Sequence, residues 1–301
     1  MARTISLWHK TIWRLARTPA AGLIKALHRA RVRPEINHRR ALAQQVPKDS
    51  RFTALARDFR RDGYCRLDDV VDAGLLAAAG TAAQKKYARA TQAAASQEST
   101  HKDFWTRLLD EDKVDGMLPA NNPFVSFALQ PAVLGVLTEV YGELPLLDDV
   151  LLVLSRPTGK KLTSSQLWHH DYDDLRTVKL YIYLTDVVSV EDGPFTFLPV
   201  PASSRLGGSW RSRRSDEEIA ARVPAEAIVR MTAPRLSVFM VETSRCLHMG
   251  SRVADGHERL MYMASYISIP RVYPEPAPRF HLNGNESELV RCVLSPKGNR
   301  I

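Results

Sequence analysis

The sequence predicts an α+β fold, mainly β, in which N-terminal helices precede a sheet sandwich or barrel. Two observations lead to this prediction. Apolar residues follow helical spacing as far as Tyr141, whereas short β-type apolar runs punctuated by Gly and Pro begin at Leu151. The two kinds of segment do not alternate as they would in a parallel βαβ sheet. With 301 residues, 45% of them hydrophobic and 25% charged, the chain can bury a large core, and the composition excludes disordered, collagen-like and disulfide-scaffold proteins.

Residues 1–50 are expected to form a basic amphipathic segment. Apolar residues recur at helical spacing while basic residues gather on another face, and the pattern repeats between Pro19 and Pro34. The first repeat carries Ile5, Trp8, Ile12 and Leu15 on the apolar face and Arg3, Lys10, Arg14 and Arg17 on the basic face.

The positive charge of the chain is concentrated in this N-terminal part. Residues 1–62 hold 15 Lys and Arg against four Asp and Glu, whereas residues 63–301 hold 27 against 29. The rest of the molecule is therefore close to neutral. We expect no nucleic acid partner, because the predicted strands also lack the interleaved aromatic and basic residues that stack on bases.

Two interpretations of residues 3–33 remain open. A cationic helix with Trp8 and Trp13 suits an anionic membrane surface, whereas the same helix could dock on the protein's own body or on a sister subunit. No apolar run reaches the roughly 18–20 residues that a bilayer span needs, and no signal-peptide core is present. The expected location is cytoplasmic, peripheral at the inner face of a membrane if the first interpretation holds, with a mitochondrial presequence as an alternative.

The region before the strands is predicted to be mostly helical. Residues 53–89 suggest helices around a short strand, with a helix end and a glycine turn within Phe59–Leu67. An Ala-rich helix follows from Ala73 to about Ala90. Residues 91–101 are expected to be a loop, and Pro131 to Tyr141 another helix.

Five apolar runs are predicted to be strands: Leu151–Leu154, Val178–Val188, Phe195–Leu198, Leu236–Val241 and Leu260–Ile269. Between them, Ser203 to Pro224 forms an arginine-rich insertion. We expect a long loop there, of the kind that serves as a lid or binding loop, with a short helix starting near Ser215. The tail after Pro270 is expected to be mostly irregular.

Two simple classes of site are excluded. The three cysteines, Cys65, Cys246 and Cys292, lie far apart and form no C-x-x-C pair, so a cysteine zinc site is not indicated and a reducing compartment fits best. No G-x-G-x-x-G or P-loop pattern is present.

The residue types for redox chemistry occur in Trp168-His169-His170-Asp171. In a strand, residues two apart share a face, so His169 and Asp171 are expected to point one way and His170 the other. His248, which follows the strand ending at Val241, is the candidate third ligand. Two His and one carboxylate on one face of a metal leave three positions open, an arrangement associated with non-haem Fe(II) oxygenases. The open positions can accept a bidentate 2-oxo acid and O2.

A 2-oxoglutarate co-substrate also needs a cation for its distal carboxylate. Arg259, 11 residues beyond His248, offers a planar fork for that group. Gln166 and Lys179 are further candidate contacts of the co-substrate, with solvated roles as the alternative. Asp173 is a candidate substrate contact, otherwise a turn residue.

The remaining polar residues considered near these positions are one further candidate substrate contact and several residues with expected structural roles. Arg205, in the insertion, is a second candidate substrate contact. Asp174 is expected to be a turn or solvated residue, and Cys246 a packed small hydrophobe. His170, His257 and His281 are expected to be hydrogen-bonded structural residues.

The ordered set of motifs resembles the phytanoyl-CoA dioxygenase-like group of Fe(II)/2-oxoglutarate oxygenases. The resemblance covers roughly residues 55–270, and the set is far more specific than H-x-D alone. The matching segments are Phe59-Arg60-Arg61-Asp62-Gly63-Tyr64, Trp168-His169-His170-Asp171, Tyr181 to Val187, Asp192-Gly193-Pro194 to Pro199, and His248-Met249-Gly250-Ser251 with Arg259.

The resemblance implies a double-stranded β-helix (jelly-roll, cupin-like) core within a domain spanning residues 51–301. It further implies iron bound by His169, Asp171 and His248, and 2-oxoglutarate held by Arg259. One departure is the segment Pro199-Val200-Pro201-Ala202-Ser203-Ser204-Arg205, where relatives have P-G-S-H; substrate contacts inferred from that loop are not carried over. Because Asp171 is retained, the halogenase variant of the fold is disfavoured.

The leading functional hypothesis is therefore an Fe(II)- and 2-oxoglutarate-dependent dioxygenase, specifically a hydroxylase. Desaturation and epimerisation are alternative outcomes at the same site. A different class of protein, a catalytically silent β-barrel scaffold with a structural metal such as Zn(II), is the competing hypothesis. The substrate is expected to be a small molecule, such as a soluble acyl thioester or metabolite, or a lipid-linked one, such as an anionic glycolipid like a lipopolysaccharide inner sugar.

Overall fold

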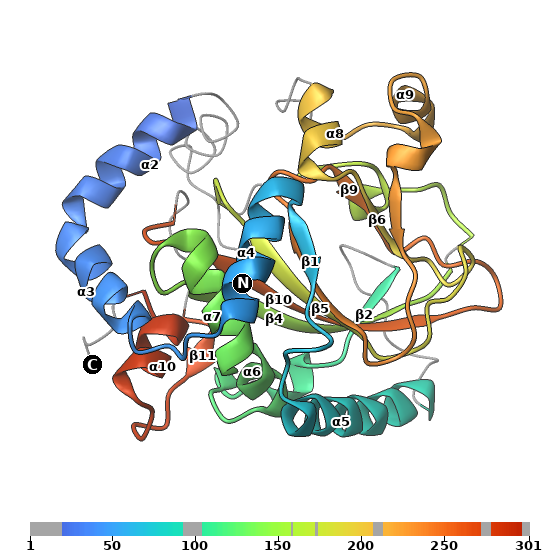
Figure 1. The fold of residues 1–301 in the computed structure, drawn as a ribbon. Helices are drawn as coiled ribbons and strands as arrows, with labels where there is room; N and C mark the ends of the chain where they lie inside the picture. Colours follow the sequence, from blue (N-terminus) through green and yellow to red (C-terminus); the bar gives the residue numbers. More distant parts are fainter. Residues whose placement is uncertain are drawn as a thin grey trace, which may run out of the picture.

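The computed structural model describes residues 20–92, 104–157, 159–171, 174–206, 213–271 and 278–296, and the statements below concern these parts of the chain. Within them lie two antiparallel sheets and a set of helices that cover one of the sheets (Figure 1). No helix among the described residues combines the length and apolar character that a membrane span requires.

The larger sheet has six strands in the order β1-β8-β5-β10-β4-β2, with every neighbouring pair antiparallel. Its strands are β1 (Tyr64–Arg66), β2 (Trp105–Arg107), β4 (Leu146–Ser155), β5 (Val178–Tyr183), β8 (Val238–Glu242) and β10 (Arg259–Ile267). The predicted strands from Leu151, Val178, Leu236 and Leu260 all lie in this sheet. The two edge strands have only three residues each, and pairing with their neighbours is what stabilises them.

The smaller sheet has the order β7-β6-β9, from β7 (Val229–Met231), β6 (Phe195–Phe197) and β9 (His248–Met249). A bridge between His169 and His248 extends it by one more segment. The two sheets enclose a common interior, which is the expected double-stranded β-helix. A separate parallel pair joins β3 (Leu118–Pro119) to β11 (Phe280–His281).

The helices lie mostly outside the sheets. Figure 1 shows α4, α6 and α7 against the larger sheet, and α8 and α9 beside the smaller one. Their bounds are α2 Ala20–Arg31, α3 Arg33–Ala43, α4 Ser50–Asp62, α5 Ala73–Gln92, α6 Pro123–Ala128, α7 Pro131–Tyr141, α8 Val200–Arg205, α9 Asp216–Ala220 and α10 Glu288–Leu294, with 3-10 turns at Asp110–Asp112, Ser164–Gln166 and Ala225–Ala227.

Strand β10 shows how the larger sheet divides the core. Leu260, Tyr262 and Tyr266 pack in the main core beneath the helices, whereas Met261 and Met263 pack in a second core between the sheets. Every residue of β10 is buried, because both faces are covered. Full burial of one such large apolar side chain contributes about 1.5–3 kcal/mol, and this burial explains why the strand is a continuous apolar run in the sequence.

The chain enters the larger sheet through a tight helix end, as the sequence predicts. Asp49 caps α4 by accepting a hydrogen bond from the Arg51 amide at 2.8 Å. At the other end Gly63 adopts φ 83°, and its amide donates to the Phe59 carbonyl at 2.7 Å. A Cβ at Gly63 would lie 2.5 Å from Cys246 Sγ, so both the left-handed backbone and the close packing require glycine.

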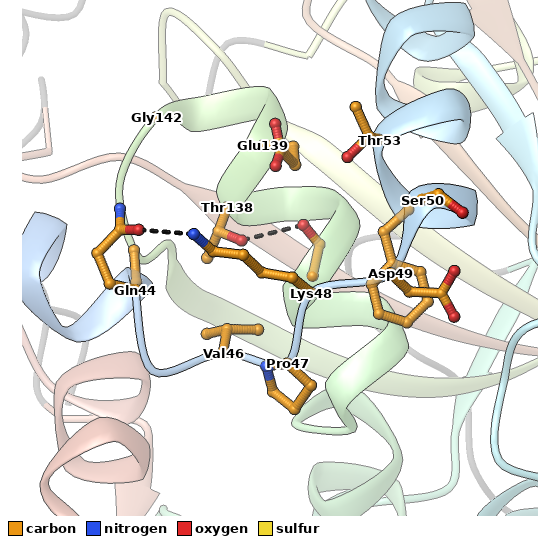
Figure 2. A pocket seen from close by; sticks show the side chains of 13 residues that line it. Gln44, Val46, Pro47, Lys48, Asp49, Ser50, Thr53, Thr138, Glu139 and Gly142 are labelled. Atoms are coloured by element: carbon orange, nitrogen blue, oxygen red, sulfur yellow. Dashed lines mark hydrogen bonds between the residues drawn. The ribbon is translucent and has the colours of Figure 1, made fainter.

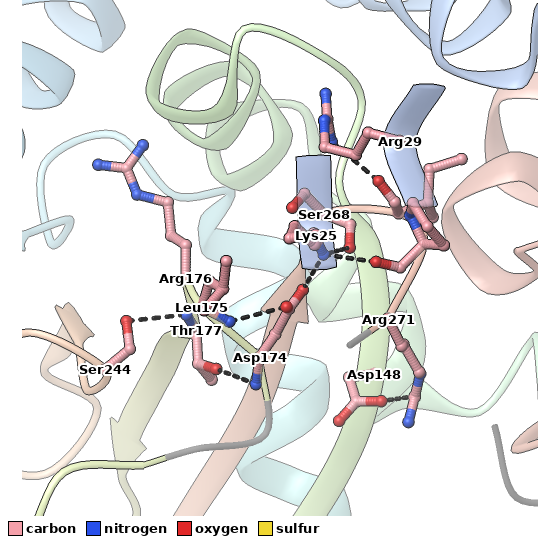
Figure 3. Close-up of polar contacts among 12 residues, drawn as sticks. Lys25, Arg29, Asp148, Asp174, Leu175, Arg176, Thr177, Ser244, Ser268 and Arg271 are labelled. Carbon is pink, nitrogen blue, oxygen red and sulfur yellow. Dashed lines mark hydrogen bonds and ion pairs between the residues drawn. The ribbon is translucent and has the colours of Figure 1, made fainter. Parts of the chain in front are cut away.

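Helix α2 docks on the body of the protein through basic rather than apolar side chains (Figure 3). Lys25 is 5% exposed, and its Nζ lies 2.6 Å from Asp174 Oδ2 and donates to the Ser268 carbonyl at 2.9 Å. Arg29 forms a two-point ion pair with Glu143. The prediction that Asp174 is solvated is therefore wrong: it is 4% exposed because it is the counter-ion of Lys25.

Two other segments differ from the sequence prediction. Residues 167–171 do not form a regular strand: Trp168 and His169 form isolated bridges, to Arg214 and His248 respectively. The insertion from Ser203 is partly helical: α8 ends at Arg205, and α9 begins after a capping box formed by Ser215 and Glu218, close to the predicted start.

Candidate metal centre

The two histidine segments are locked together by their backbones. The amide of His169 donates to the carbonyl of His248 at 2.8 Å, and the amide of His248 returns a hydrogen bond to the carbonyl of His169 at 2.9 Å. The amide of Asp171 donates to the Thr243 carbonyl at 3.0 Å. Segments that are almost 80 positions apart in the sequence are thereby held in one register.

The three side chains converge on one point. A ligand atom from each of His169, Asp171 and His248 lies within 4.8 Å of the other two. Nε2 of His169 is 3.6 Å from Asp171 Oδ1, and Nε2 of His248 is 3.7 Å from Asp171 Oδ2. His170 points elsewhere, with Nε2 3.1 Å from Ser203 Oγ. The alternation that predicted this division holds, although the segment is not a regular strand.

Backbone carbonyls fix the tautomer of both imidazoles. Nδ1 of His169 lies 2.8 Å from the Leu167 carbonyl oxygen, and Nδ1 of His248 lies 2.9 Å from that of Cys246. A carbonyl oxygen only accepts, so each Nδ1 carries the proton. The Nε2 lone pairs are therefore left to face the shared point, which is the usual arrangement of histidines that bind a metal.

The electrostatics of the cluster favour a cation. Burial lowers the pKa of His248 well below its usual value, and repulsion from His169 lowers it further, so the ring is neutral at pH 7. Burial raises the pKa of Asp171, but the charge of Lys179 and the neighbouring imidazoles more than offset this effect, so that pKa lies well below its usual range. A neutral His248 and an ionised Asp171 are in the protonation states that metal binding requires.

A buried arginine lies in the same cavity. Arg259 is 0% exposed, and Nη2 donates to Ser251 Oγ at 3.0 Å while Nη1 donates to the Gly193 carbonyl. Nε has no hydrogen-bond partner in the described part of the chain. A buried guanidinium with an unsatisfied N–H is costly unless an anion completes it. His169, Asp171, His248 and Arg259 all line this one cavity.

Of the other predicted site residues that the structure describes, Lys179 lines the cavity, whereas Gln166 and Arg205 do not. Lys179 lines the cavity, where its Nζ lies 2.6 Å from Asp171 Oδ2, so it contacts the acidic member of the cluster. Gln166 does not line it: its side chain closes the 3-10 turn by accepting from the Thr163 amide and donates to the Ser251 carbonyl. Arg205 is exposed at the end of α8 and does not line the cavity either. Asp173 lies outside the described residues.

Among the cavity-lining residues that the sequence did not mark as site residues are Trp105, Ser165 and Ser251. Ser251 belongs to a matching motif, and its nearness to Arg259 in the sequence is a signal that could have found it. Trp105 carries no such signal, because it sits on the three-residue edge strand β2, whose position is set only by pairing with β4.

A roomier cavity of about 420 Å³ lies between the α3–α4 connection and α7 (Figure 2). Lys48, Ser50, Thr138 and Glu139 line it, and Lys48 Nζ donates to Gln44 Oε1 at 3.0 Å. None of the converging residues of the metal cluster reaches it. Cavity volume alone therefore does not identify the candidate site, because the converging side chains line the smaller cavity between the sheets.

The donor set fits a specific class of metal. Two imidazole nitrogens and one carboxylate leave half of an octahedral coordination sphere open, as in the facial triad of non-haem Fe(II) enzymes. Structural zinc sites instead use four protein ligands, mostly Cys and His. Among the described residues only His169, Asp171 and His248 form a cluster of this kind.

The comparison with solved structures supports the fold. No family model and no curated protein sequence matches this chain. Among solved structures, it is similar to the non-heme alpha ketoglutarate dependent epimerase SnoN from nogalamycin biosynthesis, with 20% identity over 73% of this chain and 83% of that chain and a TM-score of 0.50. It is also similar to the apoform of EctD from S. alaskensis, with 16% identity, 74% and 79% coverage and a TM-score of 0.51.

Proposed function

We propose that this chain is an Fe(II)- and 2-oxoglutarate-dependent dioxygenase that hydroxylates an unactivated C–H bond. The observation that carries the proposal is the convergence, in one cavity, of a two-histidine, one-carboxylate cluster and a buried guanidinium with an unsatisfied N–H. The motif set of the phytanoyl-CoA dioxygenase-like group, in the same order along the chain, supports membership of that group.

Each residue has a distinct role in this proposal. His169, Asp171 and His248 hold Fe(II), and Arg259 neutralises the distal carboxylate of 2-oxoglutarate. When bound, the metal and the 2-oxo acid supply with O2 the oxidising power to break a C–H bond. Lys179, 2.6 Å from Asp171, keeps that carboxylate ionised. The closed surroundings of Arg259 exclude water and strengthen its attraction for the anion.

Metal binding tests the assignment of the three ligands. Mn(II), which reports its own binding by paramagnetic resonance, is expected to bind one site in the wild type. His248→Ala is expected to weaken binding by at least tenfold, because two remaining ligands hold the metal poorly. His281→Ala, at an exposed histidine far along the chain, is the matched control. Equal Mn(II) binding by the His248→Ala variant would overturn the ligand assignment.

We further propose that the substrate is lipid-linked and that the protein works at an anionic membrane surface on the cytoplasmic side. Helix α2 supports this proposal: with Lys25 turned inward, Leu23 and Leu27 are 66% and 57% exposed, and Arg31 and Arg33 are exposed beside them. Apolar and basic groups on one outer face bind anionic lipid together. A soluble acyl thioester or metabolite as substrate, and a mitochondrial location, are the alternatives.

Vesicle co-sedimentation tests the membrane proposal with the full chain. The variant Leu23→Glu/Leu27→Glu is expected to lose most binding to vesicles that contain anionic phosphatidylglycerol. Val188→Glu/Val190→Glu, at two valines that are 65% and 60% exposed elsewhere on the surface, is the matched control and should pellet like the wild type. Equal pelleting of both variants, or none by the wild type, would contradict the proposal.

A further inference from the structure

Three side chains form a row across neighbouring strands at one end of the cavity. In the register of the larger sheet, Ser155 on β4 lies opposite Trp105 on β2 and opposite Arg259 on β10. Directly opposite residues in a sheet project from the same face. The indole, the hydroxyl and the guanidinium therefore all point into the space between the two sheets, where Trp105 and Arg259 line the cavity.

All three side chains meet at Ser251. Its Oγ accepts a hydrogen bond from Trp105 Nε1 at 2.5 Å and another from Arg259 Nη2 at 3.0 Å, and it lies 3.3 Å from Ser155 Oγ. Ser251 and Ser155 are each 1% exposed. Ser251 also adopts φ 57°, an uncommon left-handed conformation for a residue other than glycine, and such conformations concentrate at functional sites.

Counting donors and acceptors fixes where the Ser251 proton can go. A hydroxyl has one proton and two lone pairs, whereas an indole N–H and a guanidinium can only donate. Trp105 and Arg259 therefore occupy both lone pairs of Ser251. Ser155 Oγ donates to Ser251 Oγ only at the long distance of 3.3 Å, so the Ser251 proton is left for an anionic oxygen in the cavity. Nε of Arg259, which has no hydrogen-bond partner among the described residues, is a further donor for such an anionic oxygen.

We propose that Trp105 is a positioning residue for the distal carboxylate of the 2-oxo acid, acting through Ser251. By filling one lone pair of Ser251, the indole directs the hydroxyl proton toward the carboxylate that Arg259 neutralises. The indole ring closes this end of the cavity as well. The assignment rests on the proposed function, and it makes Trp105 a determinant of the preference for a 2-oxo acid that carries a second carboxylate.

Binding of 2-oxo acids to the Mn(II)-loaded protein tests this role without turnover. Trp105→Phe keeps an aromatic wall but removes the N–H, so the Kd for 2-oxoglutarate should rise about tenfold, as for the loss of one charge-assisted hydrogen bond. The Kd for pyruvate, which lacks the distal carboxylate, and the Kd for Mn(II) should not change. Trp105→Tyr removes the same N–H and carries the test if the Phe variant does not fold.

Trp168→Phe is the matched control. The Trp168 indole donates to Asp216 Oδ1 at 2.7 Å and does not line this cavity. Quenching of tryptophan fluorescence by 2-oxoglutarate should persist in this variant and be lost in Trp105→Phe. In a double-mutant cycle with Ser251→Ala, the Trp105→Phe substitution should add little, because both remove the same contact.

The outcomes distinguish the two proposals. A wild-type protein that binds Mn(II) but no 2-oxoglutarate would refute the proposed co-substrate, and the role of Trp105 with it. A wild type that binds 2-oxoglutarate, together with a Trp105→Phe variant of equal affinity and equal discrimination against pyruvate, would overturn the role of Trp105 alone.

Discussion

At the scale of single residues, the candidate centre is prepared by its own backbone. Both imidazoles bond through Nδ1 to the carbonyl of the residue two positions earlier, so the same local device orients His169 and His248. The ligand atoms are thereby held ready without help from a distant side chain. Pre-orientation of this kind reduces the entropy that binding costs.

His170, between two of the cluster residues, makes stability depend on pH. Burial lowers its pKa from 6.5 to about 4. Below pH 6.5 His170 is protonated in the unfolded chain, whereas in the folded chain it stays neutral until about pH 4. Acidification therefore favours unfolding. Between pH 7 and pH 5 this one group should cost about 1–2 kcal/mol of unfolding free energy. Urea denaturation of wild type and His170→Gln at both pH values measures it: the variant should lose less stability, and equal losses would contradict the assignment.

Arg259 should affect the co-substrate and not the metal. Replacing it by Ala removes a charge-assisted contact worth about 1.5–3 kcal/mol, so the 2-oxoglutarate requirement should rise by about 10- to 100-fold. Mn(II) affinity should stay the same, since Arg259 does not contact the converging ligand atoms. Calorimetric titrations of both ligands measure this pair of effects. A parallel loss of metal binding would show that Arg259 supports the centre as a whole.

Only some residues of the candidate site could be predicted from the sequence. His169, Asp171, His248 and Arg259 could be predicted because strand alternation and ordered motifs constrain their types and spacing. Gln166 is a candidate contact of the co-substrate in the sequence, with a solvated role as the alternative, whereas in the structure its amide closes a 3-10 turn. Trp105 could not be predicted, because its role depends on register across three strands, which no local pattern encodes.

At the scale of elements, α2 differs from an ordinary amphipathic helix, which packs its apolar face on the protein and exposes its charged face. Its charged side chains dock on the protein and two of its leucines face outward. The cause lies in the partner surface, where Asp174, Glu143 and the carbonyls after β10 need donors. Periodicity reveals that a helix has two faces, but it does not say which face the body of the protein will accept.

The buried pair of Lys25 and Asp174 therefore gives an element-scale prediction. Lys25→Met leaves the 4% exposed Asp174 without its cation, which should destabilise the protein by about 3 kcal/mol. Lys25→Met/Asp174→Leu removes both charges and should recover most of that loss. Thermal and urea unfolding of the two variants measure the difference. Full stability of the single variant would mean that α2 does not dock in this way.

At the scale of the whole molecule, the order of elements predicted the architecture. Helices followed by strands, without alternation, favour two packed sheets over a parallel βαβ sheet, and the six- and three-stranded sheets of the protein are both antiparallel. The helical content was less accessible, because α6, α8 and α10 have only six or seven residues each. Their positions follow from the surfaces they cover.

The two-sheet arrangement also explains how distant residues form one site. His169 and His248 meet at a bridge beside the smaller sheet, while Arg259 projects inward from the larger one. The interior between the sheets therefore brings the candidate metal cluster and the buried arginine into one cavity. The metal cluster and Arg259 are accordingly expected to bind Fe(II) and 2-oxoglutarate together.

An anaerobic titration of the purified protein with Fe(II) and then 2-oxoglutarate tests that claim most directly. A visible charge-transfer band, characteristic of a 2-oxo acid chelated to Fe(II), should appear in the wild type only after both additions. The band should be lost in Asp171→Ala and should require much more 2-oxoglutarate in Arg259→Ala. Folded wild-type protein that takes up Fe(II) yet shows no band at saturating 2-oxoglutarate would contradict the account.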